Sequence, residues 1–121
     1  MSDGKCLRHA MDLAQSLGGN KDSVLYVQGT VSNPSLGRSF KHAWVELPKE
    51  NMVLDPTVDL KMPKPKYYKT FSPKNVIRMD VDVAALLAWK KGGLEFFTKT
   101  DVTNMEKHLK EMDERMGKKR K

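Results

Sequence analysis

The pattern of apolar and polar positions predicts a helix and then a strand at the start of the chain. In residues 6–17 apolar side chains recur every three or four positions, the spacing of one helix face, and the glycines at 18 and 19 predict its end. The predicted apolar face contains Leu7, Ala10, Met11, Ala14 and Leu17. Residues 23–31 are rich in β-branched and aromatic side chains, so we expect a strand there.

A hairpin is expected next. Alternation in residues 39–47 predicts a second strand, and PKEN at 48–51 predicts a tight turn. The stretch MVLDP, 52–56, predicts a third strand that its proline ends, antiparallel to the second. The residues that alternation brings to one face of the second strand are Phe40, His42, Trp44 and Glu46.

The second half of the chain predicts mostly helices. Residues 61–74, KMPKPKYYKTFSPK, read as an irregular connection, and 76–81 as a further strand or extended segment. Residues 82–93, DVAALLAWKKGG, predict a helix with Asp82 as its N-cap and glycine at its end. Residues 101–121 predict a final helix. Its apolar stripe, which we expect to pack in the core, is Met105, Leu109, Met112 and Met116.

These elements define the expected fold class as α+β, with the N-terminal helix packed on a small antiparallel sheet and further helices after it. A chain of 121 residues is long enough for one domain with one modest core. We therefore expect a single domain over residues 1–116 and a basic tail over 117–121.

Composition narrows the class of protein. Apolar residues make up 39% of the chain and charged residues 31%, which is typical of a globular, soluble protein. No apolar run approaches the roughly 20 residues that span a bilayer, and the N-terminus lacks the apolar core of a signal peptide. The single cysteine cannot form an internal disulfide. We expect a cytoplasmic protein without membrane contact.

The net charge of +7 is unevenly distributed. Residues 61–74 hold five lysines and no acid, and the tail GKKRK adds four cations. Such clusters attract nucleic acid or acidic protein surfaces, although they are also common on solvated surfaces. No zinc-ligand spacing or phosphate-binding glycine loop is visible in the sequence.

Three residues form a candidate catalytic group. Cys6 opens the first predicted helix, where unpaired N–H groups and the helix dipole favour an anion such as a thiolate. A neighbouring imidazole would stabilise the thiolate, and a carboxylate would orient that imidazole. His42 and Asp55 lie on adjacent predicted strands. Taken singly, each residue also fits a structural role: a buried thiol, a hydrogen-bonded histidine and a turn.

Four segments in order carry a family resemblance. The stretches GKCLRHAMDLAQSLGG, VLYVQGTV, HAWVEL and MVLDPT resemble the catalytic core of the transglutaminase-like superfamily over residues 4–57. The resemblance implies a papain-like cysteine fold, a triad of Cys6, His42 and Asp55, and no metal or organic cofactor.

The chain departs from that family before the cysteine. Only five residues precede Cys6, and MSDGK lacks the side chain that papain-like enzymes often use to stabilise an oxyanion. The Cys6 N–H would supply one donor, and Gln28 or Tyr26 on the next strand are candidates for the second. Trp44 is expected to wall the site or to pack on the first helix. His9, on the same helix as Cys6, is a competing base without a clear orienting acid.

The leading functional hypothesis is therefore a cysteine-dependent acyl-transfer enzyme that acts on amide or ester bonds of a protein or peptide. Water as the acceptor would make it a peptidase, amidase or deamidase, and an amine would make it a transamidase. The bacterial and archaeal members of the family that this chain resembles are mostly hydrolases, so the resemblance favours hydrolysis. Two alternatives remain open at this point: a non-catalytic interaction module on the same fold, and a small basic nucleic-acid-binding protein.

Overall fold

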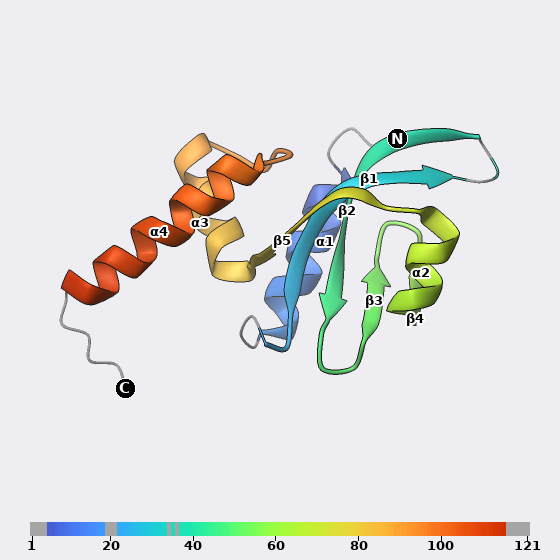
Figure 1. Ribbon diagram of the computed structural model, residues 1–121, viewed down its shortest axis with the longest axis horizontal. Helices are drawn as coiled ribbons and strands as arrows, with labels where there is room; N and C mark the ends of the chain where they lie inside the picture. The colour runs from blue at the N-terminus through green and yellow to red at the C-terminus, as the bar shows by residue number, and fades with distance from the viewer. Residues whose placement is uncertain (1–4, 19–21, 34, 36, 116–121) are drawn as a thin grey trace.

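The computed structural model describes residues 5–18, 22–33, 35 and 37–115. Four helices and five strands make up the described chain (Figure 1). The elements in order are α1 (Lys5–Leu17), β1 (Leu25–Asn33), β2 (Arg38–Leu47), β3 (Met52–Asp55), β4 (Leu60–Pro63), α2 (Lys64–Phe71), β5 (Lys74–Asp80), α3 (Val81–Lys91) and α4 (Lys99–Arg115).

The strands form one antiparallel sheet in the order β4-β3-β2-β1-β5. The first four strands pair with their neighbours in sequence, whereas β5 returns to pair with β1. The predicted hairpin is confirmed, with Val45 opposite Leu54 and Leu47 opposite Met52. The α+β class predicted from the sequence is confirmed as well.

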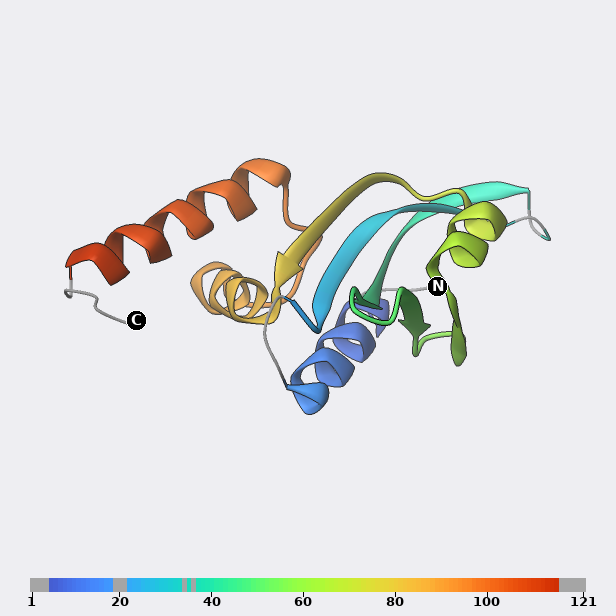
Figure 2. The ribbon, with the colours of Figure 1, turned by 60° about the horizontal axis from the view of Figure 1, so that its bottom comes forward.

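Successive side chains of a strand point to opposite faces of a sheet, and the two faces carry separate cores. On one face α1 packs against β1 and β2, so that Cys6 and Ala10 share a buried cluster with Tyr26, Ala43 and Val45. The other face is covered by α2. Figure 2 shows α1 and α2 beside different parts of the sheet. The core residues under α2 are Val27, Val31, Trp44, Val53 and Tyr67.

The last two helices lie at one end of the molecule. Helix α3 packs on the cluster beneath α1, and α4 extends away from the sheet (Figures 1 and 2). Of the predicted apolar stripe on α4, Met105 is buried, Leu109 is partly buried and Met112 is exposed. The expectation of a fully packed stripe is thus wrong at Met112, because α4 packs against the core through its first half.

The segment 61–74 corrects the sequence prediction. Instead of an irregular connection, it contains most of β4 and all of α2. Pro65 lies in the first turn of α2, where a backbone N–H has no helical partner, so the proline costs no hydrogen bond. Burial of Tyr67 against the sheet stabilises this short helix.

Two smaller predictions are also corrected. Asp80, not Asp82, occupies the N-cap position of α3; its side chain makes no capping hydrogen bond, and Asp82 lies in the first turn. Leu17, expected on the apolar face of α1, is exposed. Met116 and the tail 117–121 lie outside the described residues. Within the described chain, no helix combines the length and apolarity needed to cross a membrane.

Candidate active site

A buried histidine–carboxylate pair lies where β3 ends. The Nε2–H group of His42, on β2, donates a hydrogen bond of 2.8 Å to Oδ2 of Asp55, the last residue of β3. His42 is 4% exposed and Asp55 2%. The strands β2 and β3 are paired, and the carboxylate at the end of β3 reaches the imidazole ring on β2. The structure thus brings together these two of the three predicted residues by direct contact.

Tyr67 is a second donor to the same carboxylate oxygen. Its hydroxyl donates to Oδ2 of Asp55 at 2.7 Å, while Oδ1 is buried without a hydrogen-bond partner among the described residues. Burial, followed by the negative charge of Asp55, raises the pKa of Tyr67, so its hydroxyl remains a donor. Sequence reasoning missed Tyr67 because its helix, α2, was not predicted.

The third predicted residue, Cys6, is the second residue of α1 and is 1% exposed. Burial alone would lower the pKa of His42 and is the largest single influence. The hydrogen bond and charge of Asp55, together with the nearby Cys6 side chain, outweigh it and raise the pKa from 6.5 to about 9. The imidazole is thus held in its charged form through neutral pH.

The second ring nitrogen of His42, Nδ1, is not engaged by Asp55. Nδ1 is buried and has no partner of ordinary hydrogen-bond geometry among the described residues, although Cys6 lies close enough to the ring to affect its pKa. An imidazole held by a carboxylate at one nitrogen, with the other nitrogen unpaired beside a thiol, is the arrangement that proton exchange with sulfur requires.

His9 does not enter this cluster. It is exposed on α1, and its Nδ1 lies 3.4 Å from the hydroxyl of Thr57. Of the two histidines considered, His42 is the one that lies in the buried cluster with Asp55.

The two candidate oxyanion donors on β1 are both buried. Gln28 donates from Nε2 to the carbonyl of Glu95 at 2.9 Å and to the hydroxyl of Tyr26 at 3.1 Å, and its Oε1 accepts from the N–H of Phe97 at 2.9 Å. Both Nε2 hydrogens are thus engaged, and Gln28 would have to break one of these bonds to serve an oxyanion. Tyr26 shares the buried cluster of Cys6.

Trp44 lies beside His42. Their rings stack with centroids 6.2 Å apart, and Trp44 is fully buried under α2. Of its two expected positions it takes the one next to the site, not the one against α1. Gly29 makes this possible, since a Cβ there would come within 3.0 Å of the Trp44 ring and 3.2 Å of the Lys74 carbonyl.

A second buried acid, Glu46, helps to hold the elements around the His42–Asp55 pair in place. Its carboxylate accepts hydrogen bonds from Tyr68, from Trp44 at 3.0 Å and from Arg78 at 2.7 Å. The Nζ atom of Lys64 lies 3.6 Å from its Oε1. Burial favours the neutral acid, yet these hydrogen bonds outweigh it and lower the pKa of Glu46. Glu46 thereby ties α2 and β5 to β2, and so fixes the helix that carries Tyr67.

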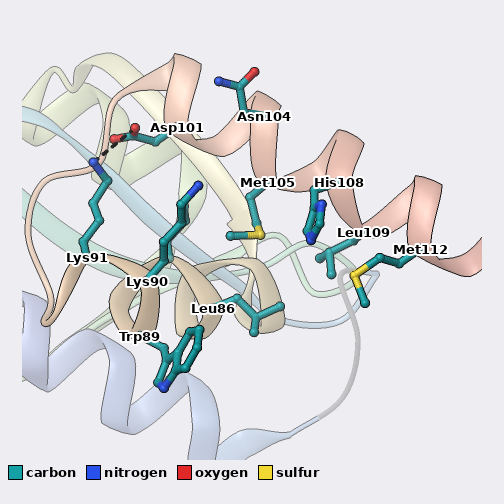
Figure 3. A pocket seen from close by; sticks show the side chains of 11 residues that line it. Leu86, Trp89, Lys90, Lys91, Asp101, Asn104, Met105, His108, Leu109 and Met112 are labelled. Carbon is teal, nitrogen blue, oxygen red and sulfur yellow. Dashed lines mark ion pairs between the residues drawn. The ribbon is translucent and has the colours of Figure 1, made fainter.

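A separate groove of about 680 Å³ lies between α3 and α4 (Figure 3). Trp89 on its α3 side is 83% exposed, and Leu86 and Met112 are also accessible. Lys91 closes one end through a 3.3 Å ion pair with Asp101. The groove could not be predicted from the sequence, because it depends on how α4 is placed relative to α3.

Neither a metal site nor a relative identifies the cluster. In the part of the chain that the structure describes, no three His, Cys, Asp or Glu side chains gather closely enough to hold a metal ion. Comparison with protein-family models, curated proteins and solved structures gives no match for this chain.

Proposed function

We propose that the protein is a cysteine-dependent acyl-transfer enzyme, with Cys6 as nucleophile, His42 as acid and base, and Asp55 as the group that orients His42. The observation that carries the proposal is the state of His42. Its Nε2 is fixed by Asp55 at 2.8 Å, while its buried Nδ1 is unpaired among the described residues and the ring lies near Cys6.

The reaction begins when the thiolate sulfur of Cys6 bonds to the carbonyl carbon of an amide or ester, and the C=O π electrons move to oxygen. When the oxyanion collapses, the bond to the leaving nitrogen or oxygen breaks, and that atom takes the proton of the His42 imidazolium. Water or an amine then gives a proton to His42 and attacks the thioester, which releases Cys6 as thiolate.

The fold supports a transglutaminase-like, papain-like core as part of the same proposal. A helix with a cysteine at its start packs on an antiparallel sheet, and the histidine and aspartate follow on two paired strands. Because the comparisons give no match, this assignment rests on residue order and geometry alone.

The burial of Cys6 and His42 should limit the rate of the proposed reaction. With Cys6 only 1% exposed and His42 4%, a substrate reaches the sulfur only after local opening. We therefore expect slow turnover. The same burial favours a second candidate function, in which the fold acts as a non-catalytic interaction module that has kept these residues as part of its core.

Labelling and acylation of the sole cysteine distinguish the two. Because the chain has one cysteine, iodoacetamide uptake and p-nitrophenyl acetate acylation each report on Cys6. The enzyme proposal predicts that the folded parent is alkylated at pH 6–7 and acylated, whereas His42→Ala loses both and Cys6→Ala releases nitrophenol only at background rate. If the parent is not acylated, and if it labels only like a free thiol with a pKa near 8.5, the result favours the non-catalytic interaction module.

A further inference from the structure

The orientation of the Gln28 amide is fixed by its backbone contacts. Oε1 accepts from the N–H of Phe97 and Nε2 donates to the carbonyl of Glu95, each at 2.9 Å. A backbone N–H can only donate and a carbonyl oxygen can only accept, so the amide has no alternative flip. The –NH₂ group of Gln28 must face Tyr26.

This orientation determines the role of the Tyr26 hydroxyl. The second Nε2 hydrogen of Gln28 points at Tyr26 Oη, 3.1 Å away, so the hydroxyl oxygen accepts that bond. Its own hydrogen must then point elsewhere, and it forms no hydrogen bond with another described residue. Tyr26 is 0% exposed. A buried donor without a partner costs about 1–3 kcal/mol, so a fold that keeps one calls for an explanation.

The free donor and the sulfur belong to one buried core. Tyr26 and Cys6 belong to the same buried cluster, formed where α1 packs on β1 and β2. Burial first, and then the charge at Cys6, raise the pKa of Tyr26, whereas the Gln28 hydrogen bond acts in the opposite direction. The hydroxyl therefore stays protonated at every pH where the enzyme would work, and it remains a donor.

We propose that Tyr26 is a catalytic residue whose O–H donates to the oxyanion formed when Cys6 attacks a carbonyl. The inference rests on the proposed function and adds a side-chain donor to it. As the sulfur–carbon bond forms, the carbonyl π electrons move to oxygen. That oxygen takes hydrogen bonds from Tyr26 and from the Cys6 backbone N–H, which lies in the first turn of α1 and has no partner within the helix. No proton is transferred in this contact. Gln28 acts as a positioning residue, because its amide keeps the hydroxyl hydrogen turned toward the site.

Acylation and alkylation of Cys6 separate this role from a structural one. Attack on p-nitrophenyl acetate builds an oxyanion, whereas displacement of iodide from iodoacetamide does not, and both need the same thiolate. Tyr26→Phe should slow acylation by about 10²–10³-fold and leave alkylation within about twofold of the parent. Ser32→Ala, which removes a hydroxyl on the same strand that lies 3.2 Å from the Ser39 hydroxyl, is the control and should change neither rate.

A second variant tests the positioning role without removing the hydroxyl. Gln28→Glu offers an acceptor oxygen to Tyr26 and turns its hydrogen away from the site, so acylation should again fall more than alkylation. Equal acylation rates in parent and Tyr26→Phe would overturn the proposal, as would equal losses of acylation and alkylation. If the parent itself is not acylated, the proposed function fails, and the role of Tyr26 fails with it.

Discussion

Tyr67 donates a 2.7 Å hydrogen bond to Oδ2 of Asp55, the same oxygen that accepts from His42. One carboxylate oxygen thus carries both donors, and Asp55 is held between a strand and a helix. Tyr67→Phe removes one donor from this buried oxygen and should destabilise the protein by about 1–3 kcal/mol. Urea unfolding of parent and variant measures the loss, and equal midpoints would show that the bond adds nothing to stability.

Asp55→Asn tests the origin of the charge on His42. The hydrogen bond and charge of Asp55 offset the effect of burial, so without the carboxylate the pKa of His42 should fall from about 9. The imidazolium that supports a thiolate is then lost, and iodoacetamide labelling should shift to higher pH while the fold is kept. Labelling rates from pH 5 to 9 measure this shift. Superimposable curves for parent and variant would mean that no activated pair exists.

Trp44 and Trp89 form a matched pair for stability. Trp44 is fully buried between His42 and Tyr67, whereas Trp89 is 83% exposed on α3. Trp44→Ala should cost about 3–5 kcal/mol, and Trp89→Ala should stay within about 0.5 kcal/mol of the parent. Chemical denaturation measures both. A fully stable Trp44→Ala protein would contradict the core role of this ring.

Stability should fall at both ends of the pH range, for different reasons. His42 has a folded pKa of about 9 against 6.5 for the free group, so its contribution is complete below about pH 6.5 and is lost as pH rises toward 9. The lowered pKa of Glu46 gives stability above its ordinary value of 4.5 that is lost on acidification. Unfolding free energies from pH 3 to 10 measure both. In His42→Gln the alkaline decline should flatten, and an unchanged slope would assign it to another group.

The basic tail, Lys118–Lys121, should be dispensable for folding. It has no apolar side chain to bury. Deletion should leave the melting temperature nearly unchanged in a calorimetric scan. A drop of many degrees would mean that the tail docks on the body.

Local patterns in the sequence were enough to predict the first half of the fold. Alternation in β2 and the proline after Asp55 predicted a hairpin that the structure confirms, with Asp55 as the last residue of β3. The contact between His42 and Asp55 follows from that hairpin, since the two residues lie on paired strands. The local pattern was informative here because the two paired strands, β2 and β3, follow each other in the sequence.

Long-range contacts could not be read in the same way. Helix α2 begins in a proline- and lysine-rich stretch, and its stability comes from burying Tyr67 on a sheet that the local pattern does not reveal. Glu46 was placed on the correct strand, but its charge is balanced by Arg78, 32 positions away. The orientation of Gln28 depends on Phe97, which is 69 positions away. No periodicity encodes such pairs.

The return of β5 to the far side of β1 has a consequence for synthesis. Strands β1 to β4 can form in turn as the chain emerges, with Cys6, His42 and Asp55 already present. Until Lys74–Asp80 appears, however, β1 is an open edge with unpaired backbone groups, which is the kind of surface that recruits strands from other chains. The interval between the emergence of β4 and of β5 is thus a stage at which the growing chain is exposed to aggregation.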